Sequence, residues 1–122
     1  MGLKTQKGAI MEAKLNIYQD CTSAEPTKTY ICRRLTYGAG KQIDELSVKI
    51  AKLEKKRESE TDEAKLQTLT EEQFNLNLEV IRVLFPEFKD EEFNGIDVFE
   101  YQEFMNEVAN EKQRILEKAS KN

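Results

Sequence analysis

The stretch from Glu71 to Phe85 constrains the fold of this chain more than any other. It reads EEQFNLNLEVIRVLF and lies between Thr70 and Pro86. Thr70, followed three residues later by Gln73, has the pattern of a capping box, in which two side chains satisfy free amide groups at a helix start. Pro86 cannot continue a helix, because it lacks an amide hydrogen and its ring clashes with the preceding turn. We therefore expect a helix over residues 71–85.

Two rows of apolar residues run along this predicted helix. The residues of the first row recur at steps of four, three and four, so they share one face. A second row lies beside the first. A helix with two apolar rows is not a solvated surface element, so we expect neighbouring helices or a partner to cover both. The first row is Phe74, Leu78, Ile81 and Phe85, and the second is Leu76, Val80 and Val83.

A two-stranded hairpin is predicted before the helices. Residues 13–19 alternate apolar with polar, and residues 28–35 are rich in strand-forming side chains. The turn-prone stretch between them contains Ser23 and Pro26. Because two isolated strands are only marginally stable in water, this hairpin must lean on a helix.

Two further helices are predicted on either side of the central one. The first begins at Thr36 and carries apolar residues at steps of three, four and three, which indicates a helix packed on its neighbour. A charged run, EKKRESETDEAK, follows it as a solvated helical segment or a connection. The last helix begins at Asp97, with Glu100 as the second member of a capping box. The apolar positions are Ile43, Leu46, Ile50 and Leu53 in the first helix, and Val98, Tyr101, Met105, Val108, Ile115 and Ala119 in the last.

These elements predict a mainly α protein, a bundle of three to four helices with a small N-terminal β-hairpin. Residues 1–12 carry no periodicity and are expected to form a flexible extension. Residues 13–122 are expected to form a single helical domain, with the hairpin in 13–35 and the helices in 36–122. At 122 residues the chain has the length of one domain.

Composition argues against several classes of function. The net charge is −4 and basic residues are interspersed with acidic ones, so nucleic acid is not an expected partner. Histidine is absent, which removes the commonest general base and a usual zinc ligand. The only cysteines, Cys21 and Cys32, flank a predicted turn, and we expect reduced thiols rather than a hairpin disulfide. No apolar run is long enough to cross a bilayer, and a cytoplasmic protein without catalytic residues or cofactors is expected.

The segment DEEFNGIDVFEYQEF has some features of a calcium-binding EF-hand loop. Such a loop needs oxygen ligands at fixed positions and a bidentate Glu at its twelfth. With Gly95 at the sixth position, Asp97 falls where an apolar residue belongs and Tyr101 falls where that Glu belongs. We therefore expect a turn followed by a capped helix, and no metal site.

Three runs in this order, KTYICRRLTYGAGKQIDEL, EVIRVLFPEF and NGIDVFEYQEFMNEV, resemble the tail assembly chaperones of long-tailed bacteriophages (siphoviruses) of Gram-positive hosts. The similarity spans residues 15–108. It implies a small, mostly helical protein that binds the tape measure protein and keeps it soluble while the tail tube polymerises. It also implies self-association, action in the host cell cytoplasm and absence from the mature virion. The N-terminal extension and the long charged C-terminal helix depart from the family pattern.

A chaperone for an apolar helical polypeptide needs apolar rows that a partner can reach. The second row of the central helix is the first candidate for partner binding, and three phenylalanines are further candidates. The alternative is that all of them are ordinary core residues. Two other functions stay open: a helical adaptor or regulatory protein, and a degenerate EF-hand-like calcium-binding module. The candidate residues are Leu76, Val80, Val83, Phe93, Phe99 and Phe104.

Overall fold

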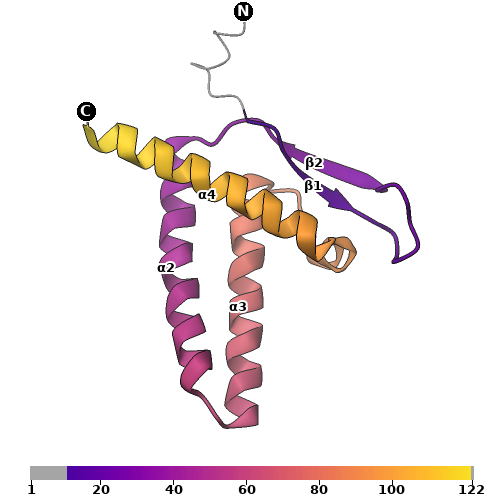
Figure 1. Ribbon diagram of the computed structural model, residues 1–122, viewed down its shortest axis with the longest axis vertical. Coiled ribbons are helices and arrows are strands. Elements are labelled where there is room, and N and C mark those ends of the chain that lie inside the picture. Colours follow the sequence, from indigo (N-terminus) through magenta and orange to yellow (C-terminus); the bar gives the residue numbers. More distant parts are fainter. Residues whose placement is uncertain (1–10, 122) are drawn as a thin grey trace, which may run out of the picture.

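The protein is mainly helical, with one small antiparallel hairpin, as the sequence predicts (Figure 1). The structure is a computed structural model and describes residues 11–121. Helices α2 and α3 form a long antiparallel pair, α4 crosses one end of that pair, and the hairpin packs beside α4. The predicted extension over residues 1–12 lies outside the described residues, except for its last two. The elements are β1 (Ala13–Ile17), β2 (Lys28–Cys32), α2 (Tyr37–Ser59), α3 (Glu63–Leu84), the 3-10 helix η1 (Asp90–Gly95) and α4 (Val98–Lys121).

The hairpin buries one face, because side chains alternate along each strand. Leu15 pairs with Tyr30, and both are buried, while Ile31 on the outer face is exposed. Ala13, Ile17 and Cys32 complete the inner face. The pairing extends one step before β1, since the Met11 amide donates to the Arg33 carbonyl at 2.9 Å. This hydrogen bond holds residue 11 beside the hairpin, while β1 itself begins at Ala13.

Helix α2 begins where the sequence predicts. The Thr36 hydroxyl accepts a hydrogen bond from the Ala39 amide at 3.2 Å, which caps the helix start. Ile43, Leu46 and Leu53 are buried and Ile50 is half-buried, so the predicted apolar positions do face a neighbouring helix. That neighbour is α3, which α2 contacts more extensively than it contacts α4.

Helix α3 begins two turns earlier than predicted. Its cap is Asp62, whose carboxylate accepts hydrogen bonds from the Ala64 and Lys65 amides. Thr70 lies inside the helix, and Gln73 bonds instead to Arg57 of α2, so the predicted capping box was wrong. The reason is tertiary packing, because the charged segment before Thr70 is stabilised as a helix by lying alongside α2. The predicted end is confirmed, since the helix stops at Leu84, before Pro86.

Helix α4 begins after Asp97, whose carboxylate accepts hydrogen bonds from the Phe99 and Glu100 amides at 2.8 and 3.0 Å. Glu100 does not complete the predicted capping box with its side chain. It accepts hydrogen bonds from the Tyr18 hydroxyl and the Asn16 amide of the hairpin. Val98, predicted on the buried stripe, is 69% exposed, because the stripe that packs inward runs through Phe104 and Val108.

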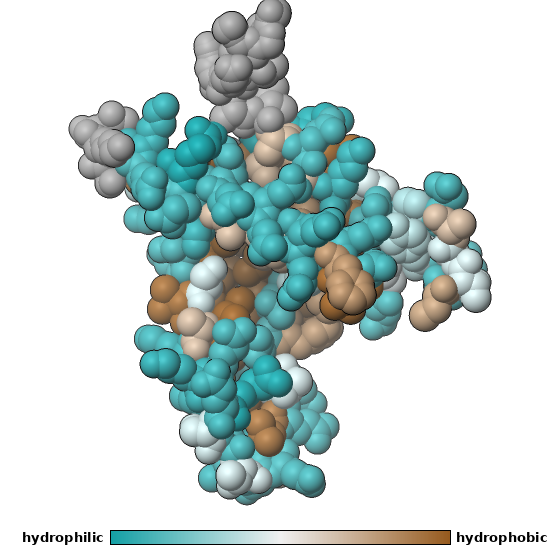
Figure 2. Space-filling model, in the orientation of Figure 1, coloured by the Kyte–Doolittle hydropathy of each residue, from teal (hydrophilic) through white to brown (hydrophobic). Residues whose placement is uncertain are grey.

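The main core gathers where the hairpin, η1, α4 and one end of α2 and α3 meet, and we name this part the head. The remaining part of the α2–α3 pair, residues 50–73, extends beyond α4, and we name it the arm. Figure 2 shows hydrophobic side chains gathered below α4 and few of them toward the tip of the arm. Buried core residues of the head include Leu15, Val80, Ile81, Phe104 and Val108. The chain thus combines a closed head with an open two-helix arm.

Candidate helix-binding groove

The second apolar row of α3 divides between core and surface. Val80 is 1% exposed and belongs to the core of the head, so it is not part of a surface that a partner can reach. Leu76 and Val83 are half-buried. They lie seven residues apart, on the same side of α3, and both line a surface groove between α3 and α2.

The three phenylalanine candidates lie in three different environments. Phe104 is 1% exposed and stacks against Phe85, so it is a core residue. Phe93 is half-buried and makes edge contacts with Phe74 and Tyr101. Phe99 is 80% exposed in the first turn of α4. The structure therefore does not bring these three side chains together with the second row of α3.

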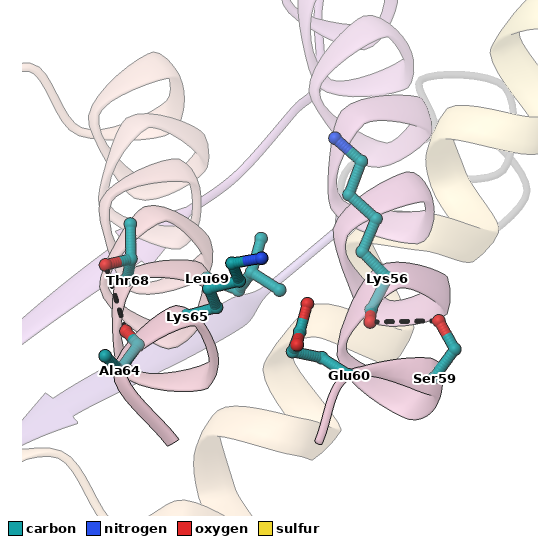
Figure 3. A pocket seen from close by; sticks show the side chains of 7 residues that line it. All are labelled: Lys56, Ser59, Glu60, Ala64, Lys65, Thr68 and Leu69. Atoms are coloured by element: carbon teal, nitrogen blue, oxygen red, sulfur yellow. Dashed lines mark hydrogen bonds between the residues drawn. The ribbon is translucent and has the colours of Figure 1, made fainter. Parts of the chain in front are cut away.

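The groove consists of three adjoining hollows along the α2–α3 pair. The hollow nearest the tip has a volume of about 420 Å³ (Figure 3), the middle one about 400 Å³ and the one nearest the head about 440 Å³. Lys56 lines both of the first two, and Lys49 and Glu79 line both of the last two, so the hollows form one continuous groove. Its apolar floor is Leu46, Leu53, Leu69, Leu76 and Val83.

The floor has the spacing of a helix-packing seam. Leu46 and Leu53 of α2 are seven residues apart, and the three floor residues of α3 repeat the same interval. Residues at this interval lie two turns apart on one side of a helix. A third helix laid along the groove could place its own apolar residues against both rows, as in a three-helix coiled coil.

The groove opens on the side of α2 that faces away from α4. The α4 side of α2 is marked by Asp44, which accepts a hydrogen bond from Lys112 at 3.1 Å, and by Gly40, where an added Cβ would lie 3.9 Å from Lys112 Cγ. Lys49 and Lys56 lie on the opposite side of the same helix, given 3.6 residues per turn. Figure 1 shows α4 in front of the pair, with α2 to the left of α3. Figure 3 shows the pair from the other side, with α3 to the left of α2 and α4 behind them. The head therefore leaves this face uncovered.

The two walls of the groove carry opposite charges over its middle hollow. The α2 wall presents three lysines, Lys49, Lys52 and Lys56, and the α3 wall presents Glu72 and Glu79. Within residues 11–121, no ion pair involves any of these five side chains. They are thus available to pair with charges on something bound between them.

The EF-hand-like segment is occupied by structural contacts. Its first part forms η1, and Glu92 accepts hydrogen bonds from Tyr30 at 2.6 Å and Lys28 at 3.0 Å. Desolvation raises the pKa of Glu92, but hydrogen bonds from the Lys89 amide, Tyr30 and Lys28 outweigh it and lower the pKa to about 2. Burial raises the pKa of Tyr101 to about 12, which keeps this phenol neutral. Across residues 11–121, no group of three or more Cys, Asp or Glu side chains could hold a metal ion.

The remaining motifs have structural roles. Cys21 is exposed and Cys32 is buried, and both are free thiols, as expected from the sequence. Desolvation raises the pKa of the Cys32 thiol. The glycine-containing run from Tyr37 to Lys41 forms the first turn of α2. Among the described residues, no helix has the length and apolarity that a membrane span requires.

Sequence reasoning missed most of the groove. It identified Leu76 and Val83, but it assigned Leu46 and Leu53 to helix packing alone and gave the lysine and glutamate walls no role. The seven-residue intervals were the available signal, although one helix does not reveal whether a neighbour covers its apolar row. Comparisons of this chain with protein-family models, curated proteins and solved structures find no match.

Proposed function

We propose that this protein is a tail assembly chaperone that binds the tape measure protein of a long-tailed bacteriophage and keeps it soluble during tail assembly. The observation that carries the proposal is the uncovered groove along α2 and α3, with its apolar floor and charged walls. The resemblance of three sequence runs to this family gives the partner its identity. The mainly helical fold is the one that the resemblance implies.

The groove suits a client that is helical and apolar on one side. Such a client exposes hydrophobic surface before the tail tube encloses it, and this surface promotes aggregation. The groove would cover one apolar stripe of the client with five floor residues and leave the outer side of the client to solvent. Repeated binding by self-associated copies would coat a long polypeptide, and the proposal includes self-association for this reason.

The proposed role is restricted to the time of assembly. In this role the protein acts in the host cell cytoplasm and is absent from the mature virion. Mass spectrometry of purified virions checks this directly. The proposal predicts that tape measure peptides are found and that peptides of this chain are not.

Co-expression with the tape measure protein tests the function. The wild-type chain is expected to keep the tape measure protein in the soluble fraction, and Leu76→Asp is expected to lose this effect because it places a charge on the groove floor. Val48→Asp is the matched control, since Val48 is half exposed on α2 and does not line the groove. Circular dichroism confirms that both variants fold.

Two results would contradict the proposal. One is a tape measure protein that is equally soluble without this chain. The other is a Leu76→Asp variant that folds and still retains the tape measure protein as well as wild type does. The second result would move the binding surface away from the groove.

A further inference from the structure

The opposite charges on the two groove walls can distinguish the two directions in which a helix could bind, which an apolar groove alone cannot do. The lysine wall belongs to α2 and the glutamate wall to α3, and these side chains face each other across the apolar floor. A helix lying between them presents one flank to each wall. Turning that helix end for end exchanges the two flanks, so wall charge distinguishes one direction of binding from the other.

We propose that the groove binds an amphipathic helix with one acidic and one basic flank, and that the two walls set the direction in which this helix runs. This inference rests on the proposed function, because it assigns a chemistry and a direction to the client helix. The acidic flank pairs with Lys49, Lys52 and Lys56, and the basic flank pairs with Glu72 and Glu79.

The handedness of the helix converts this pairing into a definite direction. Let the bound helix place positions a and d of each heptad on the floor, so that e and g form its flanks. Seen from the groove side with the tip downward, α3 lies to the left of α2, and α2 runs toward the tip (Figure 3). A right-handed helix that runs parallel to α2 then turns its e positions toward α2 and its g positions toward α3. Acidic e and basic g positions therefore specify a helix parallel to α2.

The charge pattern also changes sign at both ends of the groove. At the head end, Glu45 of α2 stands on the wall opposite Arg82 of α3. At the tip, Glu60 reaches toward α3 and Lys65 reaches toward α2 (Figure 3). The lysine and glutamate walls thus occupy the middle of the groove, where a helix of three or more turns would contact them.

Designed peptides test the direction without the natural client. Two 28-residue peptides share leucine at a and d. Their two central heptads carry either Glu at e with Lys at g or the reverse, and their outer heptads carry Gln at e and g, because the wall charges change sign at both ends of the groove. This length of about four heptads keeps the free peptides helical, since helices under roughly 12–15 residues are marginal in water. Each carries a nitroxide at its N-terminus, and amide signals of the isotope-labelled protein report which groove end the nitroxide approaches.

The expected result is a reversal between the two peptides. The peptide with acidic e positions broadens signals at the head end, near Gln42, and the other peptide broadens signals at the tip, near Glu60. A third peptide with Glu at both e and g is expected to bind about tenfold more weakly, because exposed ion pairs each contribute little and several are lost together. At 1 M salt the direction preference is expected to vanish, because the Debye length falls to about 3 Å.

A variant in which the charges of the two walls are exchanged tests the direction most strongly. Lys49→Glu, Lys56→Glu, Glu72→Lys and Glu79→Lys together are expected to reverse the direction of both peptides. The matched control, Lys55→Glu with Glu71→Lys, changes exposed neighbours on the same two helices and is expected to leave the direction unchanged. Circular dichroism and a thermal melt establish that each variant folds.

Several results would overturn the inference. The two peptides could bind in the same direction, one peptide could broaden the amide signals at both groove ends equally, the broadened signals could lie on α4, or neither peptide could bind. Dimerisation of the chain through the groove, with the peptides excluded, would overturn it too. If the peptides bind in the expected directions and the tape measure protein does not bind, the result supports a groove that sets helix direction. The same result contradicts the tape measure protein as the client.

Discussion

The head and the arm are built from the same two helices, yet they bury their apolar residues to very different degrees. In the head, Ile81 of α3 is fully buried and Val80 is 1% exposed, and both belong to one core cluster with residues of α2, α4 and the hairpin. Across the arm, residues 50–73, Leu53 is the one buried side chain. The difference shows that helical apolar spacing predicts that a face will be covered, but not whether this chain supplies the cover.

Polar contacts differ between the two regions in the same way. The head is joined by contacts between distant segments, such as Tyr18 with Glu100 and Tyr30 with Glu92. The arm is joined across its seam by Gln73, which bonds to Arg57 and Glu54. A small number of buried apolar contacts is typical of a region that opens at low free energy. We therefore expect the arm to be the less stable region.

Two valines three residues apart on α3 give the largest expected difference in stability between core and groove. Val80→Asp is expected to lower the free energy of unfolding by about 4 kcal/mol, because it buries a charge without a partner. Val83→Asp is expected to cost about 1 kcal/mol, since Val83 is half-buried beside the groove. Urea denaturation measures both. Equal losses would remove the distinction between the core and the groove on this helix.

A glycine in the head tests how closely its segments approach. An alanine Cβ at Gly95 would lie 2.4 Å from the Tyr18 carbonyl oxygen and 3.0 Å from Ile17 Cγ2. Gly95→Ala is therefore expected to cost about 2 kcal/mol, because the backbone next to β1 must shift. Gly38→Ala is the control, since nothing lies within 4 Å of its added Cβ. A Gly95→Ala variant as stable as Gly38→Ala would show that the head is packed more loosely here.

The pH dependence of stability is expected to come from the head. The pKa of Glu92 falls from 4.5 to about 2 on folding, because hydrogen bonds from the Lys89 amide, Tyr30 and Lys28 outweigh its desolvation. A lowered pKa stabilises the fold fully above the unfolded value, and this stabilisation is lost as pH falls from about 4.5 toward about 2.

Thermal melts between pH 6 and pH 2 check this expectation. Glu92→Gln is expected to melt lower than wild type near pH 6 and to show a smaller decrease in Tm toward pH 2. Glu71→Gln, at an exposed position on the arm, is the control and is expected to follow the wild-type decrease. Wild-type and Glu92→Gln curves that stay parallel would contradict the role of Glu92.

The smallest expected loss of stability comes from removing the helix caps, one in the arm and one in the head. Asp62→Ala and Asp97→Ala each remove a carboxylate that accepts two amide hydrogen bonds at a helix start, and each is expected to cost about 1 kcal/mol or less. Asp62→Ala is expected to fray the tip of the arm locally, while Asp97→Ala lowers global stability. Amide hydrogen exchange distinguishes the two, and a global loss in both variants would contradict an independently opening arm.

The sequence predicted those features that depend on local chemistry. Alternation along residues 13–17 and 28–32 predicted the hairpin, Thr36 predicted the start of α2, and Pro86 predicted the end of α3. The prediction failed where tertiary packing decides. Thr70 and Gln73 have capping-box spacing, but packing along α2 extends α3 back to Asp62.

The candidate site was predictable only in part for the same reason. Leu76 and Val80 belong to one apolar row in the sequence, yet Val80 is buried in the core of the head and Leu76 is half-buried at the groove. Phe99 and Phe104 are similar residues on one helix, with exposures of 80% and 1%. They are five residues apart and therefore lie about 140° apart around the helix. How α4 crosses the α2–α3 pair decides which of the two faces the core, and no local pattern specifies that crossing.

Hydrogen exchange of the chain, alone and bound to the tape measure protein, tests the proposed groove most directly. Binding in the groove is expected to slow amide exchange along residues 46–56 of α2 and 69–83 of α3. Exchange in β1 is expected to remain unchanged, since no residue of β1 lines the groove. Slower exchange confined to α4 or the hairpin, with the α2–α3 pair unchanged, would contradict a client-binding groove between these two helices.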